Sequence, residues 1–131
     1  MTRREAREQA FILVFEKSFN EETEIAELID LAKEFGVIED DEFLEKLVTT
    51  ACDKQSEIDE HISNNAKGWK LNRISKVSLA ILRLALAEIL YFEDIPAGVS
   101  INEAVELAKK YATDEDASFV NGLLGTVARS V

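Results

Sequence analysis

The sequence has few residues that interrupt helices or cross-link a chain: one proline, five glycines and one cysteine among 131 residues. So few breakers, together with abundant Leu, Ala, Glu and Lys, favour an all-α fold. A single thiol, Cys52, excludes an internal disulfide and fits a reducing compartment. Its apolar neighbours Val48 and Ala51 indicate an inert core thiol. The length predicts one domain, residues 1–131.

Long apolar runs are missing as well. The run AFILVF near the N-terminus has six residues and soon meets Glu16 and Lys17, so it is not the core of a signal peptide. No stretch reaches the eighteen or so apolar residues that a membrane-spanning helix needs. We therefore expect a cytoplasmic protein with no membrane partner.

Catalytic and metal-binding patterns are equally scarce. His61 is the only histidine, and Glu57, four residues earlier, would make two ligands at most. The acidic run Glu39 to Glu42 fits a helix start, where the macrodipole favours negative charge, better than a cation site. No glycine-rich phosphate loop occurs. These observations predict no catalytic residues, no metal and no cofactor, and hence a protein that is not an enzyme.

Apolar spacing and capping residues predict about seven helices joined by short loops. Capping boxes are expected at Thr2–Glu5, Ser100–Glu103 and Thr113–Asp116. The first helix should end near Phe19, Asn20 and Ser56 should cap the second and fourth helices, Gly36 should stop the second, and residues 64–68 should form a loop. A long helix ends near Phe92, before Pro96. We expect a compact bundle in two sub-bundles that share the first helix.

The net charge of −11 argues by itself against a nucleic-acid partner, but the charge is unevenly distributed. Residues 20–65 hold three basic and fifteen acidic groups, whereas residues 66–83 hold five basic groups and no acid. Residues 1–19 hold four basic and three acidic groups. Because a Debye length is about 8 Å at physiological salt, a local basic surface can act partly independently of distant acids.

Arg3, Arg4 and Arg7 are placed where they reduce the stability of their own helix. Each cation in a first turn opposes the macrodipole by about 0.3–1 kcal/mol, and Arg3 with Arg7 is a like-charge pair. One interpretation is that Glu5 and Glu8 neutralise them, as Glu8 would for Arg4. The other is RNA recognition, because the planar arginine fork suits phosphates and bases better than lysine does.

Four segments, in this order and at these separations, resemble the NusB family of bacterial transcription antitermination factors. They are TRREAREQAF, RISKVSLAILRLALAEI, DIPAGVSINEAVELAKKY and FVNGLL. The resemblance covers nearly the whole chain and is weakest from residue 20 to residue 66. The combination of IP, INEAVELAK and FVNG is much more specific than any one of these pieces.

The resemblance implies a NusB-like all-α fold without enzymatic activity. It also implies two partners: the ribosomal protein NusE, and the boxA element of the nascent ribosomal RNA leader. Binding of the pair to boxA helps RNA polymerase to read through terminators, within an antitermination complex. NusE would dock along the helix of about residues 73–91, and exposed apolar residues there would also allow a homodimer. A NusB-like protein-interaction scaffold without RNA binding is the alternative that the acidity favours.

The family's RNA surface corresponds in this sequence to Arg3, Arg4, Arg7, Arg83, Tyr111 and Phe119. Single-stranded bases stack on aromatic rings for about 1–3 kcal/mol each, which suits Tyr111 and Phe119. The alternative for Phe119 is burial with Val120 and Leu123. Gly122 costs roughly 0.5–1 kcal/mol inside a helix, which suggests that a neighbouring helix packs closely there.

Overall fold

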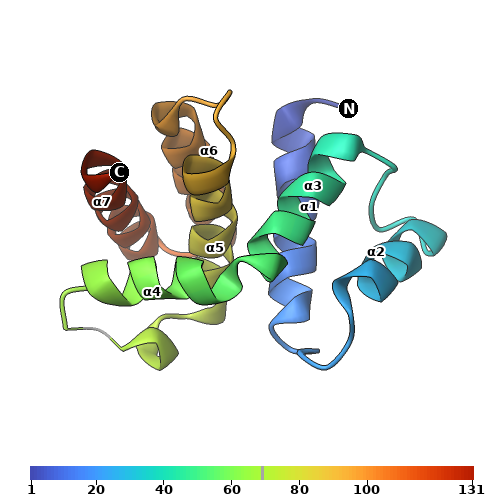
Figure 1. The fold of residues 1–131 in the computed structure, drawn as a ribbon, viewed down its shortest axis with the longest axis horizontal. Helices are drawn as coiled ribbons and strands as arrows, with labels where there is room; N and C mark the ends of the chain where they lie inside the picture. The colour runs from blue at the N-terminus through green and yellow to red at the C-terminus, as the bar shows by residue number, and fades with distance from the viewer. Residues whose placement is uncertain (69) are drawn as a thin grey trace.

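The computed structural model describes residues 1–68 and 70–131, and all regular structure within these ranges is helical (Figure 1). The helices are α1 (Arg3–Lys17), α2 (Ile25–Glu34), α3 (Glu42–Asp53), α4 (Gln55–Asn65), the short 3₁₀ helix η1 (Leu71–Arg73), α5 (Lys76–Tyr91), α6 (Ala97–Tyr111) and α7 (Asp114–Ser130). The prediction of an all-α bundle of about seven helices is confirmed for the described part of the chain.

Several helix ends are fixed by the residues that the sequence suggested. Thr2 and Thr113 each form a complete capping box with the acid three residues later, at the starts of α1 and α7. Asp41 caps α3 by accepting a hydrogen bond of 2.9 Å from the Leu44 amide. Gly36 follows α2 with a φ of +72°, a left-handed conformation that glycine adopts without strain.

Other predicted boundaries are wrong. Asn20 does not cap α2, because its side-chain amide donates to the Glu16 carbonyl at 3.1 Å and Glu24 holds the N-cap position. Ser56 lies inside α4, which begins only two residues after α3 ends. The first helix ends at Lys17 rather than Phe19, and α4 continues into the predicted loop as far as Asn65.

The predicted capping box at Ser100 is also wrong, since α6 begins three residues earlier, directly after Pro96. Both side chains of that box have partners on other helices. The Ser100 hydroxyl donates to Glu88 at 2.9 Å, and the Glu103 carboxylate accepts from Arg4 at 2.8 Å. Proline favours a helix start because its fixed φ suits one and it has no N–H to leave unpaired.

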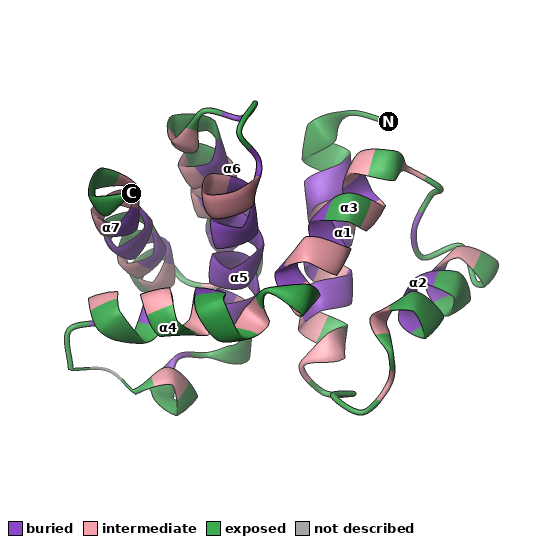
Figure 2. Ribbon diagram, in the orientation of Figure 1, coloured by how far each residue is buried: buried purple, intermediate pink, exposed green. Residues whose placement is uncertain are grey.

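Helix α5 occupies the centre of the bundle. Every residue from Ser78 to Glu88 is buried, so this stretch shows no exposed face (Figure 2). It contacts α1 and α3 on one side and α4, α6 and α7 on the other. Helix α5, rather than the first helix, therefore joins the two sub-bundles.

The remaining helices complete the two groups around one continuous hydrophobic core. Helix α2 packs on α1 and α3 at one edge of the molecule, and α7 packs on α6 at the opposite edge (Figure 1). No helix in the described ranges is long and apolar enough to cross a membrane.

Candidate nucleic-acid interface

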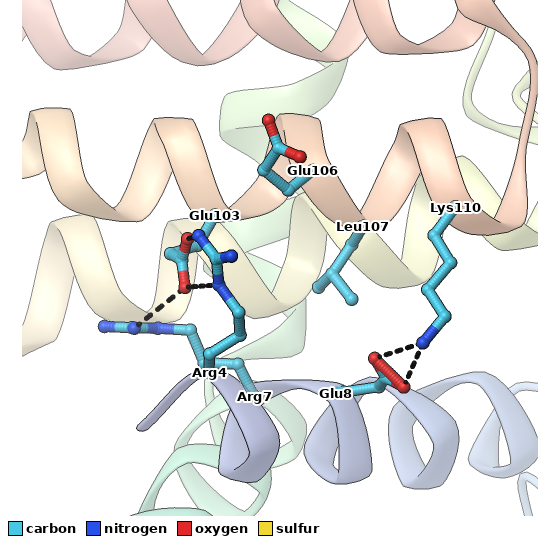
Figure 3. Close-up of a pocket in the computed structure, with 7 residues that line it drawn as sticks. All are labelled: Arg4, Arg7, Glu8, Glu103, Glu106, Leu107 and Lys110. Atoms are coloured by element: carbon cyan, nitrogen blue, oxygen red, sulfur yellow. Dashed lines mark hydrogen bonds and ion pairs between the residues drawn. The ribbon is translucent and has the colours of Figure 1, made fainter. Parts of the chain in front are cut away.

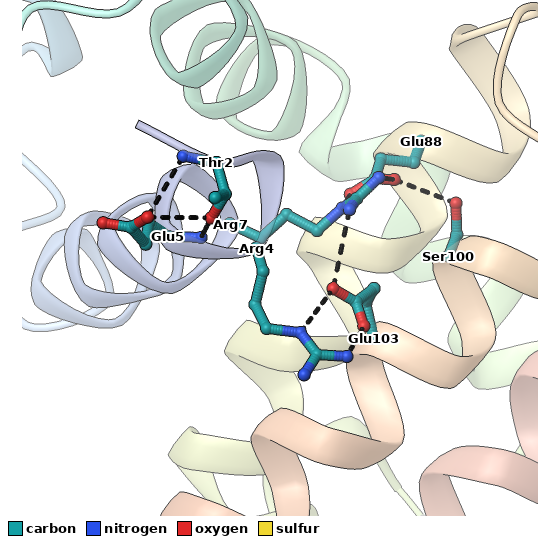
Figure 4. A network of polar contacts seen from close by, with 7 residues as sticks. All are labelled: Thr2, Arg4, Glu5, Arg7, Glu88, Ser100 and Glu103. Atoms are coloured by element: carbon teal, nitrogen blue, oxygen red, sulfur yellow. Dashed lines mark hydrogen bonds and ion pairs between the residues drawn. The ribbon is translucent and has the colours of Figure 1, made fainter.

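The capping box at Thr2 fixes the first turn of α1, which carries the three arginines; Figure 4 shows Arg4 and Arg7 pointing from it towards carboxylates of α5 and α6. Arg3 is exposed, and its guanidinium carbon lies 4.3 Å from the centre of the Phe43 ring. Such a cation–π contact is worth about 0.5–1 kcal/mol at an exposed site. Arg3 thus stays at the surface, next to an aromatic ring of α3.

Arg7 lies in the interior instead. Its guanidinium donates two hydrogen bonds, of 2.8 and 2.9 Å, to the Glu88 carboxylate of α5. Ser100 donates a third hydrogen bond to the same carboxylate, at 2.9 Å (Figure 4). The Arg7 and Glu88 side chains are only 7% and 2% exposed. The Arg7 guanidinium is therefore not presented to an RNA phosphate in this structure.

Arg4 points along the surface towards α6. Its guanidinium donates hydrogen bonds of 3.1 and 2.8 Å to Glu103, whose carboxylate also lies 3.7 Å from Arg7. The hydrogen bond from Arg4 lowers the pKa of Glu103, and the same bond raises the pKa of Arg4. The acids that offset these arginines come from α5 and α6, and not from Glu5 and Glu8 of α1.

Glu8 joins the same two helices one turn further along. It accepts hydrogen bonds of 2.7 and 2.9 Å from Lys110 and one of 3.0 Å from the Tyr111 hydroxyl. The hydrogen bond from Lys110 lowers the pKa of Glu8, whereas burial is the main cause of the raised pKa of Tyr111. The Tyr111 ring packs at 4.9 Å from the Phe11 ring and remains 38% exposed.

A hollow of about 280 Å³ lies between α1 and α6 (Figure 3). It is lined by Arg4, Arg7, Glu8, Glu103, Glu106, Leu107 and Lys110. The charged side chains alternate in sign across it, and its cations are the ones already bonded to carboxylates. A phosphate entering this hollow would compete with Glu103 and Glu8 for their partners.

Arg83 is separate from this groove. It donates two hydrogen bonds of 2.9 Å to Asp59 of α4, and both side chains are largely buried. The guanidinium therefore holds α4 against α5 and is not exposed to solvent as an RNA-binding side chain would be.

Phe119 lies elsewhere, on α7, and is half-buried. One side borders a hollow of about 240 Å³ near the start of α5, which Arg73 and Glu115 also line. The other borders a hollow of about 390 Å³ that it shares with Lys67 and Arg129. Phe119 thus borders two hollows while it also packs against the hydrophobic core, and two basic side chains line the larger hollow.

Gly122 lines that larger hollow, and a side chain built there would meet no atom within 4 Å. The predicted close approach of another helix at Gly122 is therefore wrong. The glycine instead leaves open space beside the Phe119 ring.

The structure thus separates the six predicted residues into four places. Arg3 lies at the surface against Phe43 of α3. Arg4 and Arg7 share the groove between α1 and α6, close to Tyr111; Arg83 lies between α4 and α5; Phe119 lies on α7. Three basic residues at these places, Lys67, Lys110 and Arg129, were not among the residues predicted from the sequence. Lys110 had a local signal, since it precedes Tyr111 in the segment AKKY.

The surroundings of Glu57 and Cys52 explain two of the other candidate groups. Glu57 accepts a hydrogen bond from the Tyr91 hydroxyl, and burial raises the pKa of Tyr91 to about 12. Burial also raises the pKa of the half-buried Cys52 thiol, which keeps it protonated and unreactive at neutral pH. Within residues 1–68 and 70–131, no group of three or more His, Cys, Asp or Glu side chains is arranged to hold a metal ion.

The sequence matches known proteins over its full length. A model described as the NusB family matches residues 4–129. A protein of Natranaerobius thermophilus named transcription antitermination protein NusB is 44% identical over 135 residues, which cover 100% of this chain and 97% of that protein. A protein of the same name from Lachnoclostridium phytofermentans is 46% identical over 130 residues, 97% of this chain and 98% of that one.

Solved structures give the same result. NusB of T. maritima is 31% identical with a TM-score of 0.86, over 98% of this chain and 92% of that one. A chain in a structure of antitermination factors NusB and NusE in complex with dsRNA is 29% identical with a TM-score of 0.87, over 98% of this chain and 97% of that one. The fold and these similarities define an all-α protein of the transcription antitermination class. The chain belongs to the NusB family.

Proposed function

We propose that the protein acts with NusE, binds the boxA element of nascent ribosomal RNA in the cytoplasm, and promotes processive transcription by RNA polymerase. The observation that carries this proposal is the full-length similarity to a chain solved with NusE and dsRNA.

The accessible surface favours a smaller RNA interface than the sequence alone suggested. Arg3, Tyr111 and Phe119 remain at or near the surface, whereas Arg7 and Arg83 are buried in ion pairs. We place the principal contact at Phe119, because Lys67 and Arg129 line the same hollow. A base stacked on the ring would leave its phosphates near these two cations.

NusE is expected at the exposed parts of residues 73–91. The middle of that span, Ser78 to Glu88, is buried and offers no docking surface. Arg73, Ser75 and Lys76 are exposed at one end, and Ile89 to Tyr91 are half-buried at the other. We propose that NusE contacts one of these ends. A homodimer through the same apolar residues would compete with NusE.

A scaffold without RNA binding is the second candidate. It is favoured by the groove between α1 and α6, where Arg4, Arg7 and Lys110 are each bonded to a carboxylate. On this alternative the arginines of α1 are structural only, and the acidic surface repels RNA.

Gel-shift titration of a boxA RNA, with and without NusE and at two salt concentrations, tests the proposal. We expect weak binding by the protein alone, tighter binding with NusE, and a steep loss of affinity between about 50 and 200 mM salt. Equal RNA affinity with and without NusE would contradict the proposal that NusE assists RNA binding. No RNA binding in either case would favour the scaffold without RNA binding.

Phe119→Leu sharpens the test, because leucine keeps an apolar side chain in the helix but removes the flat ring. Loss of one stacking contact worth about 1–3 kcal/mol corresponds to roughly 5–150-fold weaker RNA binding. Phe35→Leu is the matched control, since Phe35, directly after α2, is 75% exposed. Equal affinities of the two variants would remove Phe119 from the interface.

A further inference from the structure

Helix α2 has apolar residues on two faces, and only one face is used in the core. Leu28, Ile29 and Ala32 are buried against the rest of the bundle. Leu31, Phe35 and Val37 are 41%, 75% and 47% exposed. Figure 2 shows exposed residues along this helix, which lies at the edge of the molecule. Exposed large apolar side chains that lie together mark binding sites more often than scattered ones do.

The local backbone keeps these three side chains at one end of α2. Leu31 and Phe35 are four residues apart, so they lie one above the other on the same side of the helix. After Gly36, the Val37 amide turns back and donates to the Ala32 carbonyl at 2.8 Å. The Gly36 amide donates to the Lys33 carbonyl at 3.1 Å, which completes a helix-ending turn. Val37 therefore stays beside the helix end.

This apolar group lies in the most acidic part of the chain. Residues 20–41 hold nine acidic side chains and one basic side chain, Lys33. Lys33 is bonded to Glu45 at 3.0 Å and lies 3.2 Å from Asp40. Glu27 and Glu34, four residues before and three after Leu31, are exposed on the same side of the helix. Such a rim repels RNA phosphates and anionic lipid surfaces alike.

We propose that Leu31, Phe35 and Val37, with Glu27 and Glu34 as their rim, form a docking face for a basic amphipathic segment of a partner protein. The apolar residues of the partner would cover the Phe35 ring, and flanking Lys or Arg side chains would meet the two carboxylates. Helix α2 belongs to the sub-bundle opposite α7 (Figure 1). A partner here would leave both Phe119 and the exposed ends of residues 73–91 uncovered.

Charge decides against a second copy of the chain as the occupant. Two of these faces brought together about a twofold axis would each carry the same excess of acids, and like charges across an interface are costly. Docking of the basic residues 66–83 of another copy would be a heterologous contact, which forms rings or open chains rather than a simple dimer. A basic segment of a different protein avoids both the like-charge repulsion and the formation of rings or open chains.

Fluorescence anisotropy with two synthetic peptides of leucine and lysine tests the proposal. One peptide carries leucine at helical spacing, and the other has the same composition in scrambled order, so that both have the same charge. We expect the helical peptide to bind about tenfold more tightly than the scrambled one, and its affinity to fall with added salt. Equal affinity would show that only net charge is recognised, which would overturn the proposal.

Three variants locate the binding. Leu31→Gln with Phe35→Gln should weaken binding of the helical peptide by about tenfold or more. Glu27→Gln with Glu34→Gln should weaken it and flatten its salt dependence. Val99→Gln, at a valine of α6 that is 44% exposed, is the matched control and should have no effect. Equal effects of the first variant and this control would place the peptide elsewhere and overturn the proposal.

Sedimentation of the wild type and of Leu31→Gln with Phe35→Gln identifies the competing occupant. We expect the two proteins to have the same molecular mass in solution. Self-association of the wild type that this variant abolishes would show that a second copy covers the face, against the proposal. Since these side chains are exposed, circular dichroism should show the same helix content in all variants.

Discussion

The Arg7 guanidinium and the Glu88 carboxylate form a buried pair with two short hydrogen bonds, and Ser100 supplies a third to the same carboxylate. This pair joins α1 to α5, and Ser100 extends the network to α6. Taking two charges out of water is expensive, so the pair is stable only because nearly all of its bonding positions are filled. Removal of either partner would leave the charge of the other one unpaired in the core.

Arg7→Ala should therefore lower the free energy of unfolding by about 3–5 kcal/mol, since it leaves Glu88 buried without its cation. The double substitution of Arg7 and Glu88 by methionine should recover much of this loss, because no charge is then left alone. Urea unfolding measures both effects. Arg3→Ala, at the exposed neighbour, is the control and should cost about 0.5–1 kcal/mol. An unchanged midpoint for Arg7→Ala would contradict the structural role.

Among the helices, the ends follow two different rules. The starts of α1 and α7 are set by local capping boxes, whereas α6 starts directly after Pro96, and Ser100 and Glu103 bond to other helices instead of forming a cap. The end of α2 depends on the backbone alone, since Gly36 has a φ of +72°. Residues with a Cβ atom rarely adopt that backbone conformation, so a substitution at Gly36 is strained even though the surrounding space is open.

Gly36→Ala should lower the stability by about 1–2 kcal/mol, the cost of a left-handed conformation for a residue with a Cβ atom. Gly122→Ala is the matched control: the same atom is added inside α7, again into open space. It should raise the stability by about 0.5–1 kcal/mol, because alanine is the better helix former. Thermal unfolding followed by circular dichroism compares them, and shifts of the same sign would contradict this account of Gly36.

Over the whole molecule, charge is unevenly distributed. The sector around α2 is strongly acidic, whereas the basic residues of the segment 66–83 lie around η1 and on α5, and the groove between α1 and α6 holds paired charges of both signs. Two of its acids, Glu8 and Glu103, have pKa values below the ordinary 4.5 because each accepts hydrogen bonds from a cation. These bonds link the two sub-bundles.

The sign of the pH dependence follows from those two pKa values. A carboxylate whose pKa is lower in the folded state adds stability that is fully present above its unfolded pKa and is lost as the pH falls through the folded one. We expect Glu8 and Glu103 to stabilise the wild type at pH 7 and to lose this effect below about pH 4.5.

Urea unfolding at pH 7 and at about pH 3 should therefore show a smaller acid-induced loss of stability in the double variant Glu8→Gln, Glu103→Gln than in the wild type. Glu106→Gln removes a carboxylate from the same hollow and is the control for charge alone. It should keep the pH dependence of the wild type. If both variants reduced that dependence equally, the specific pairs would not be its cause.

Much of the fold follows from local sequence. The helical spacing of apolar residues, the threonine capping boxes and Gly36 determined the helix class and several helix ends, because each acts within a few residues. The segments from TRREAREQAF to FVNGLL likewise determined the family. The candidate site is different, since six residues were predicted from the resemblance and only some of them lie at the surface.

The sequence by itself determined an all-α chain with an arginine-rich start and an acidic sector from residue 20 to residue 65. Only the tertiary structure decided which charges are paired, because Arg7 with Glu88 and Arg4 with Glu103 lie 81 and 99 residues apart in the chain. A guanidinium bonds to whichever carboxylate helix packing brings within about 3 Å, and that distance depends on the whole fold. For the same reason, packing alone left Phe119 and Phe35 accessible on opposite sub-bundles.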